Sequence, residues 1–374
     1  MEYWQQVPLQ DIAKIGIKCS LSRNEYFEKI QVVNHRTLSK YPVISSESQI
    51  NEKSDPQKQY NLYPSGTILV SLGRFSHGIG LLEIEAYVEK SVCAVYVNSE
   101  YVLPEYLFHV LRWHQMKHKE RWNQRWLSNL IITLPPKMKQ KYIINLMSKI
   151  DSIKRKHENL ILLASQYTLA QYGEIIEKGL HSEPISTLGQ FVEKIEIGRK
   201  VQPNLLQSGT FVLKGKPKKY FENCLLEVKQ GNGGSLYPNV IAHKDDLLWY
   251  RYSDEQTFKP VRIHRWEMPV AISNEWIRLK PLQKISNEFL AKYLEVNYHH
   301  SKFIFQNKSR KEIIDILSDL SIKIPSIQNQ QIFSSITVKA SKIIADSRIA
   351  IEKMQLLYET YFDEFLVREA LRME

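Results

Sequence analysis

The residues of this chain with the clearest chemical potential are clusters of Lys and Arg set among Trp and His. The first cluster covers residues 112–126, where basic side chains could pair with phosphates while planar side chains pack on sugar, base or protein. We predict phosphate contact for four of its members: Lys117, Lys119, Arg121 and Arg125. The other interpretation is a core of tryptophans beneath a solvated charged face, and for Trp122 and Trp126 we favour the core.

Three further basic clusters follow in the second half of the chain. They contain Lys214, Lys216, Lys218 and Lys219, then Arg251, Arg262 and Arg265 around two tryptophans, and finally Lys308 and Arg310. Phosphate contact needs only positive charge near the duplex, so we expect these residues to position DNA rather than to read its bases.

Base reading needs polar side chains at the tips of loops that enter a groove. The Gly-bounded stretch at residues 73–78 offers one such loop, with Arg74, Ser76 and His77 as candidates for DNA contact. An ordinary hairpin explains this stretch equally well, so both interpretations stay open.

The charge balance favours a polyanionic partner without establishing one. The 374 residues include 51 Lys and Arg against 40 Asp and Glu, a formal net charge of +11. The three cysteines, Cys19, Cys93 and Cys224, have neither disulfide-framework nor zinc-ligand spacing. The sequence shows no signal-peptide pattern and no run of about 18 apolar residues, so we predict a soluble, cytoplasmic protein.

No spacing in the sequence predicts a catalytic centre. Residues 231–234 are Gly-rich but lack the Lys-Ser/Thr of a P-loop, and the Pro-Pro at residues 135–136 lacks the neighbours of an amino-methyltransferase site. Asp245 and Asp246 lack the carboxylate and Lys spacing of a metal-dependent nuclease. We therefore predict that the chain is not an enzyme and uses no cofactor and no metal.

The elements that must position these residues are organised by an internal duplication. Residues 127–135, Leu-Ser-Asn-Leu-Ile-Ile-Thr-Leu-Pro, return 190 residues later as Leu-Ser-Asp-Leu-Ser-Ile-Lys-Ile-Pro at residues 317–325. Gln140 and Gln330 lie at the same offset. A duplicated binding unit indicates a duplicated or bipartite target.

A long helix is expected after each copy of the repeat. Residues 140–176 place apolar residues at helical spacing with almost no Gly or Pro. We assign heptad position a to residues 143, 150, 157, 164 and 171, position d three residues later, and the same positions plus 190 in the second helix. Matched stripes at a period of 3.5 predict that the two helices pair as an antiparallel coiled coil. The alternative is that each stripe is a core face against its own domain.

A mixed globule precedes each long helix, which gives an α+β fold class of two globules and two paired helices with a pseudo-twofold repeat. Strands are expected at residues 67–72, 91–97, 220–228 and 247–250, and short helices at residues 104–115 and 286–297. The predicted domains are residues 1–136, a long helix at 137–178, a linker at 179–184, residues 185–326, and a second long helix at 327–374.

These features together resemble the DNA specificity subunit of Type I restriction-modification systems. The likeness rests on two globules each followed by a long helix, the openings at residues 4–12 and 188–191, the strand at residues 65–70, and the repeated segment before Gln140 and Gln330. It covers nearly the whole chain. The repeated segment is its most specific part.

The resemblance implies a function in phage defence. Each globule would be a target recognition domain that reads one half of a split double-stranded DNA site, and the paired helices would act as a ruler for the gap. The implied partners are DNA methyltransferase subunits, which dock on the helices, and a translocating nuclease subunit. No membrane is implied.

The sequence departs from the family pattern in two places, and two other functions stay open. Residues 244–248, Lys-Asp-Asp-Leu-Leu, stand where a Gly-Asp-like turn is expected, and Lys137, Lys139 and Lys141 surround Gln140 where the family is usually more acidic. The other functions are a stand-alone or diverged defence nuclease and a DNA-independent coiled-coil scaffold protein. The nuclease would cut DNA with magnesium alone, and the scaffold would show no salt-dependent affinity for duplex DNA.

Overall fold

Two compact units make up the chain in the computed structural model. Unit 1 contains residues 1–158 and 348–374, and unit 2 contains residues 159–347. The structure describes residues 4–16, 32–48, 50, 60–72, 78–97, 100–117, 122–179, 185–200, 211–217, 225–227, 240–254, 259–299 and 301–368. Helices α5 (Lys137–Gly179) and α9 (Ile327–Asp363) each contribute residues to both units.

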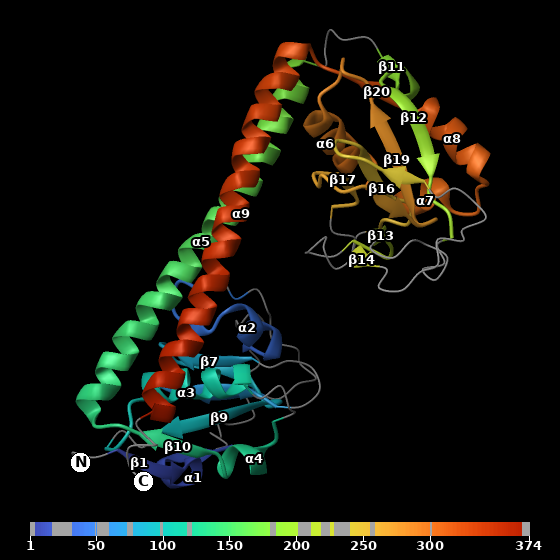
Figure 1. Ribbon diagram of the computed structural model, residues 1–374. Coiled ribbons are helices and arrows are strands. Elements are labelled where there is room, and N and C mark those ends of the chain that lie inside the picture. Colours follow the sequence, from blue (N-terminus) through green and yellow to red (C-terminus); the bar gives the residue numbers. More distant parts are fainter. Residues whose placement is uncertain are drawn as a thin grey trace. The chain divides into compact units, whose positions relative to one another are not determined.

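The globule of unit 1 is built on two small sheets (Figure 1). A five-stranded sheet has the order β2 (Ala13–Ile15), β9 (Val92–Val97), β6 (Ile68–Ser71), β7 (Ile79–Leu82) and β4 (Val43–Ile44). A three-stranded sheet has the order β3 (Val32–Val33), β8 (Ala86–Glu89) and β5 (Tyr60–Tyr63). The helices of this globule are α1 (Leu9–Ile12), α2 (His35–Lys40), α3 (Pro104–Lys117) and α4 (Gln124–Ser128).

The sequence of unit 1 explains this arrangement. Every residue of β6 and β7 is buried, as expected for apolar strands covered on both faces. Helix α3 buries the six consecutive residues 106–111, because it lies between the sheet and the long helices. The core of the globule therefore includes residues from both α5 and α9.

Unit 2 has two four-stranded sheets. The first has the order β12 (Val192–Ile197), β19 (Trp276–Pro281), β16 (Leu247–Tyr250) and β17 (Val261–Ile263), all antiparallel. The second has the order β14 (Leu225–Glu227), β13 (Phe211–Leu213), β18 (Val270–Ile272) and β15 (Ile241–Ala242). Its helical elements are η1 (Leu188–Gln190), α6 (Asn287–Asn297), α7 (Ser301–Phe305) and α8 (Arg310–Ser318). Trp249, Trp276 and Phe289 are fully buried and anchor the core.

The sequence repeat forms the same substructure in each unit. In unit 1, β10 (Ile131–Leu134) pairs antiparallel with β1 (Gln5–Pro8), and in unit 2, β20 (Ser321–Lys323) pairs antiparallel with β11 (Ile185–Thr187). A Pro ends each repeat, between the short strand and the long helix. Pro cannot continue a strand, but it can precede the first turn of a helix. The repeat is therefore the junction between globule and helix.

A buried glutamine fixes each junction. Gln140 accepts a hydrogen bond from Leu103 N (2.9 Å) and donates to the carbonyl oxygens of Tyr101 (3.1 Å) and Pro135 (2.9 Å). Gln330 accepts from Ser286 N (2.9 Å) and donates to Pro325 O (2.9 Å). Both side chains thus satisfy main-chain groups at the start of their helix, and a buried group left unpaired there would cost about 1–3 kcal/mol.

The structure explains why residues 244–248 can form a turn without the Gly that the family pattern leads us to expect. In unit 1, Gly66 adopts a φ of 82° in the turn before strand β6. In unit 2, Asp245 adopts a φ of 70° in the turn before strand β16, and Asp246 accepts a hydrogen bond from His243 N (2.7 Å). Asp tolerates the left-handed region better than most side chains do, so the turn forms without Gly.

Helices α5 and α9 run antiparallel in each unit. In unit 1, the rings of Tyr142 and Phe365 lie 6.0 Å apart, and Lys154 Nζ lies 3.3 Å from Gln355 Oε1, so α9 runs backwards as α5 advances. In unit 2, the rings of Tyr172 and Phe333 lie 5.9 Å apart. The expected antiparallel pairing is therefore confirmed (Figure 1).

Half of the expected heptad is one residue out of register. Positions 140, 143, 147, 150, 154, 157, 161, 164, 168, 171 and 175 of α5, and the same numbers plus 190 in α9, are all buried or partly buried and form the seam; Tyr172 and Phe362 are buried in addition. The expected a residues thus lie in the seam, but the d positions lie one residue later than assigned. Ile153, Leu160 and Tyr167 are exposed instead, at 42%, 44% and 55%. The d positions were wrong because the assignment preferred Ile153 and Tyr167, whereas the polar neighbours Lys154 and Thr168 occupy the seam.

Most expected elements are found at or close to their predicted bounds. The strands at residues 67–72, 91–97 and 247–250 correspond to β6, β9 and β16, and the helices at 104–115 and 286–297 correspond to α3 and α6. The described part of residues 220–228 is β14. Residues 180–184 of the expected linker and the Gly-rich residues 231–234 lie outside the described residues. Among the helices that the structure describes, none is long and apolar enough to cross a bilayer.

A pair of neighbouring isoleucines tests the corrected register. Ile344 lies in the seam, whereas Ile343 is 44% exposed. We expect Ile344→Ser to lower the free energy of unfolding by about 1–2 kcal/mol, because it removes partly buried apolar surface. Ile343→Ser, with the same change in helix propensity, should cost less than about 0.5 kcal/mol. Urea denaturation, monitored by circular dichroism, measures both changes. Equal losses of unfolding free energy in the two variants would support the register assigned from the sequence instead.

Candidate nucleic-acid interface

The first basic cluster is divided between the core and the surface of unit 1. Trp122 is 4% exposed, and its ring lies 4.6 Å from the partly buried Trp126, so the core interpretation of both is confirmed. Arg125 is exposed on α4, whose first turn is capped by the Asn123 side chain accepting a hydrogen bond from Trp126 N (2.8 Å). Arg125 therefore lies on the surface, next to the packed rings of Trp122 and Trp126.

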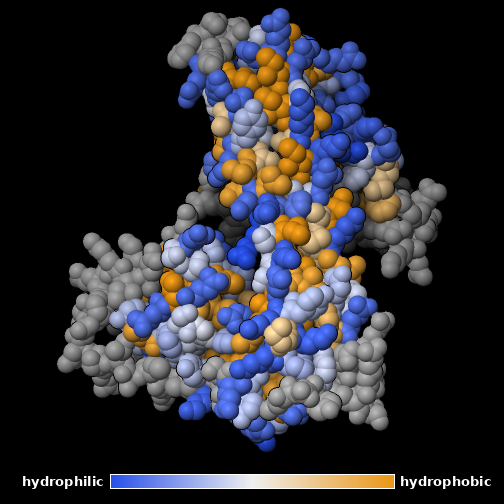
Figure 2. Space-filling view, turned by 90° about the vertical axis from the view of Figure 1, so that its left-hand side faces the viewer, coloured by the Kyte–Doolittle hydropathy of each residue, from blue (hydrophilic) through white to orange (hydrophobic). Residues whose placement is uncertain are grey.

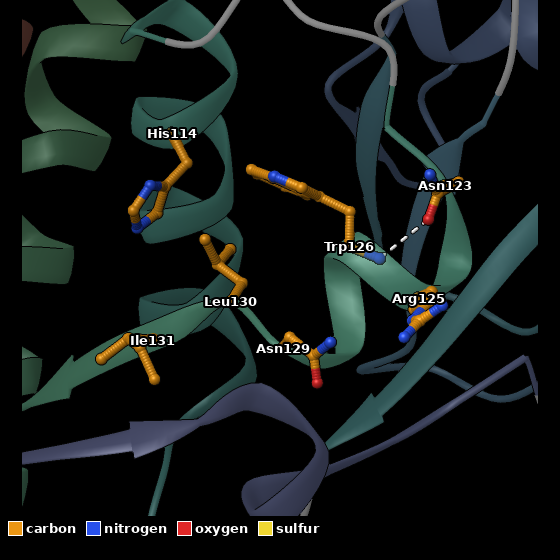
Figure 3. A pocket seen from close by; sticks show the side chains of 7 residues that line it. All are labelled: His114, Asn123, Arg125, Trp126, Asn129, Leu130 and Ile131. Atoms are coloured by element: carbon orange, nitrogen blue, oxygen red, sulfur yellow. Dashed lines mark hydrogen bonds between the residues drawn. The ribbon is translucent and has the colours of Figure 1, made fainter.

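An open hollow of about 560 Å³ lies beside the ring of Trp126. Figure 3 shows Trp126, Leu130 and His114 around it, with Arg125 and Asn129 on the α4 side. Its lining combines apolar side chains with amide and guanidinium groups. Such a surface can meet a phosphate or a base edge, but it contains no feature that selects one of them.

Other cations of this cluster hold α3 against the long helices. Lys117 Nζ pairs with Asp363 Oδ2 (2.7 Å), and the same carboxylate accepts a hydrogen bond from Trp113 Nε1 (3.0 Å). Arg112 Nη1 pairs with Asp151 Oδ2 (2.6 Å) and is nearly buried. Lys117 thus has a structural partner at the end of α9, and its role in DNA contact stays a prediction.

A buried pair of rings joins α3 to α9 beneath those ion pairs. The Nδ1 atom of His109 lies 3.0 Å from the hydroxyl of Tyr358, which also donates to His109 O (3.2 Å). The guanidinium of Arg112 lies 5.3 Å from the Tyr358 ring centroid. Burial and the positive charge of Arg112 lower the pKa of His109 to about 3, although Asp151 acts in the opposite direction. His109 is therefore neutral at physiological pH.

Several predicted cations of unit 2 are neutralised by carboxylates. Arg265 pairs with Asp245 (2.8 Å) and with Glu288, whose pKa is lowered by Ser334 and Arg265 against the opposing effect of burial. Lys216 pairs with Asp254 (2.8 Å). Lys308 lies 3.9 Å from Glu312. An ion pair of this kind weakens but does not abolish attraction to a polyanion.

The remaining predicted residues of unit 2 fall into two groups. Lys214 is exposed, and Arg262 is partly buried on β17. Arg251 is 9% exposed and donates to Asn274 O (2.9 Å), and Arg310 donates to the carbonyl oxygens of Ile197 and Gly198. Sequence reasoning missed Arg199, which lies near Arg310; the available signal was the pair of basic residues Arg199 and Lys200 after Gly198.

Some of the predicted DNA-contact residues lie outside the residues that the structure describes. They are Arg74, Ser76, His77, Lys119, Arg121, Lys218 and Lys219. The three candidate base-reading residues of the loop at residues 73–78 are among them. Its role stays a prediction.

Comparison with known proteins bears on the architecture just described. Residues 1–163 match the family model of the Type I restriction modification DNA specificity domain. The match covers the globule of unit 1 and the first part of α5, and it confirms the resemblance to specificity subunits.

Two solved structures share the fold. The chain is similar to the Type I restriction-modification S subunit from M. genitalium, with a TM-score of 0.58 and 14% identity, covering 96% of this chain and 94% of that one. It is also similar to a chain in a structure of the assembly and conformational transition of the Type I R-M system, with a TM-score of 0.50 and 15% identity, covering 97% of both chains. No curated protein matches the sequence at a significant level. The α+β fold class with two globules and a helical pair is confirmed.

The described residues offer no metal centre. Among the described residues of the whole chain, no group of three or more His, Cys, Asp or Glu side chains could hold a metal ion. Asp245 and Asp246, the carboxylates considered for nuclease chemistry, are paired with Arg265 and Arg278 respectively. Both lie in the turn between β15 and β16, where these ion pairs hold them.

The buried His109 predicts a pH dependence of stability. The unfolded chain binds a proton near pH 6.5, whereas the folded chain does so near pH 3, so stability is full above pH 6.5 and falls below it. The loss is up to about 1.4 kcal/mol per pH unit. We expect His109→Asn to reduce the difference in unfolding free energy between pH 7.5 and pH 5.5 by about 1 kcal/mol. His299→Asn, at an exposed histidine, serves as the control, and an unchanged pH difference in His109→Asn would refute this assignment.

Proposed function

We propose that this chain is the non-catalytic DNA specificity subunit of a Type I-like restriction-modification complex. The observation that carries the proposal is the combination of a DNA specificity domain at residues 1–163 with a second globule joined to the paired helix by the same junction. The residue ranges 1–136 and 185–326 would be two target recognition domains. Each would contact one half of a bipartite double-stranded DNA site.

The paired helices would set the distance between the two half-sites. Helix α5 contains 43 residues and is therefore about 65 Å long. The seam has the same 3- and 4-residue spacing throughout both helices, which favours a rod of constant geometry. A rod of this kind would specify a gap in base pairs without contacting the intervening bases.

Methyltransferase subunits would dock on the exposed apolar side chains of the helices. In unit 2, Leu160, Leu163 and Tyr167 are 44%, 59% and 55% exposed on α5. In unit 1, Ile153 and Leu357 are 42% and 37% exposed. Figure 2 shows hydrophobic side chains gathered over the helices. Large exposed apolar patches mark protein interaction sites, and a related structure concerns assembly of a Type I R-M system.

A translocating nuclease subunit would complete the assembly, because the chain is proposed to select DNA rather than to cut or methylate it. Residues 1–163 match the model of a DNA specificity domain. The catalytic steps would therefore lie on the partner subunits. The specificity subunit would contribute binding energy and registration on the duplex.

Methylome sequencing tests this function directly. We expect deletion of the gene for this chain to abolish methylation at one split motif in the host genome, because the methyltransferase would lose its target recognition. Reintroducing the full chain should restore the same motif. A methylome that is unchanged by the deletion, or a purified chain that cuts plasmid DNA with magnesium alone, would overturn the proposal.

A deletion of matched heptads tests the ruler. Removing residues 155–161 and residues 345–351 takes the same seven positions from both copies of the helix and preserves the seam. The helices would shorten by about 10 Å, so the gap in the methylated motif should shorten by about three base pairs, while both half-sites stay the same. An unchanged gap, or altered half-sites with the old gap, would contradict the ruler.

A further inference from the structure

Three arginines of unit 2 converge on one turn of the backbone. The turn joins β18 to β19, and Arg199, at the end of β12, bonds to it through Arg199 N and Ile272 O (3.3 Å). Arg251, at the end of β16, bonds to the same turn through Arg251 N and Glu275 O (2.9 Å). Strands β12 and β16 both flank β19, so two arginines follow two strands at one edge of the globule.

The third arginine comes from helix α8. Nη2 of Arg310 donates to the carbonyl oxygens of Ile197 and Gly198, the two residues before Arg199. The positive charges of Arg199 and Arg251 contribute, after burial, to a lowered pKa of Arg310. Arg310 therefore lies close enough to Arg199 and to Arg251 for their positive charges to repel its own.

The hydrogen bonds that Arg251 and Arg310 donate do not neutralise the charge of these two side chains. Arg251 and Arg310 bond to main-chain carbonyl oxygens, which satisfy N–H groups but carry no net charge. Among the described residues, no carboxylate pairs with either of them. The carboxylate of Glu275 accepts hydrogen bonds at Oε2 from two neutral donors, Gly215 N (2.7 Å) and Ser273 Oγ (3.3 Å), and keeps its negative charge.

The cluster is graded from the interior to the surface. Arg251 is 9% exposed, and within the described part of the chain its buried Nε has no hydrogen-bond partner. Arg199 is partly buried and Arg310 is exposed. A buried guanidinium donor without an acceptor is costly, and an anion at the cluster would remove both this cost and the mutual repulsion.

We propose that Arg199, Arg251 and Arg310 form a seat for one phosphate group of the duplex DNA backbone. Forked guanidinium donors match phosphate oxygens in geometry and charge. The exposed Lys200 and Lys311 adjoin the seat in sequence, so the positive surface continues along a strand rather than closing around a small ion. The seat rests on the proposed function and assigns it a contact in the second globule. It positions DNA and reads no base.

Salt dependence of DNA binding by the full chain provides the test. The probe is a fluorescently labelled duplex of about 30 base pairs, titrated at several KCl concentrations. Each neutralised phosphate contributes about 0.9 to the slope of log Kobs against log salt. We expect Arg199→Gln and Arg310→Gln each to reduce the slope by about one. The double variant should also lose about one rather than two, because both arginines hold the same phosphate.

Two matched variants separate charge from structure. Lys292→Gln removes one positive charge from α6, where Lys292 pairs with Glu295 (2.9 Å), and should leave the slope unchanged. Arg310→Lys retains the charge but loses the fork, and should restore most of the slope. If Arg310→Lys behaves like Arg310→Gln while the thermal midpoint of both equals that of the wild type, the arginine serves only the carbonyl oxygens and the seat is refuted.

The outcomes distinguish this inference from the proposed function. A wild-type chain with no salt-dependent affinity for the duplex would overturn the proposed function, and the seat with it. A wild-type chain that binds with a steep slope, but whose Arg199→Gln and Arg310→Gln variants keep that slope, would overturn the seat alone. The same holds if inorganic phosphate raises the thermal midpoint in an Arg199-dependent manner while the DNA slope is unaffected.

Discussion

The seam between α5 and α9 is the constraint on which the rest of the structure depends. Its spacing of 3 and 4 residues is the same in both helices, and every seam position of α5 has a counterpart 190 residues later in α9. Since each helix supplies residues to both units, each globule has a core completed by both helices. In unit 1, Ile143 and Phe362 belong to the same apolar cluster as the strands. The core of each globule is therefore complete only where both helices pack against it.

The repeat explains how one design is used twice with different globules. The conserved part of the duplication is the junction: a short strand pair, a Pro, and a buried Gln that bonds to the main chain before the next helix. The sheets that follow from each opening differ in strand number and order. A fixed junction with a variable globule allows the DNA-contacting surface to change while the attachment to the helices stays the same.

The sequence predicted the architecture well because the architecture rests on local patterns. Long helices, the repeat and the apolar strands each have a period or composition that needs no tertiary information. The heptad register failed because the helices carry three apolar stripes rather than two, and Leu160 or Tyr167 looks like a better seam residue than Lys154 or Thr168. Only packing decides between them, since a Lys can bury its aliphatic stem in a seam while its amine reaches a polar partner. The extra stripe that misled the assignment is the same surface proposed to bind partner subunits.

The candidate site was harder to predict because charge is visible in a sequence but its neutralisation is not. Lys117 and Arg265 are as basic in sequence as Arg310, yet the first pairs with Asp363 about 250 residues away and the second with Asp245 and Glu288. Arg310 bonds instead to carbonyl oxygens that leave its charge uncompensated. Attraction to a phosphate depends on net local charge rather than on the number of cations, because each ion pair within the protein must be weakened before its cation can serve DNA. Basic clusters are therefore best ranked by the partners that the fold gives them. Among the described residues, Arg251 and Arg310 of unit 2 bond to carbonyl oxygens and rank above Lys117 of unit 1, which pairs with a carboxylate.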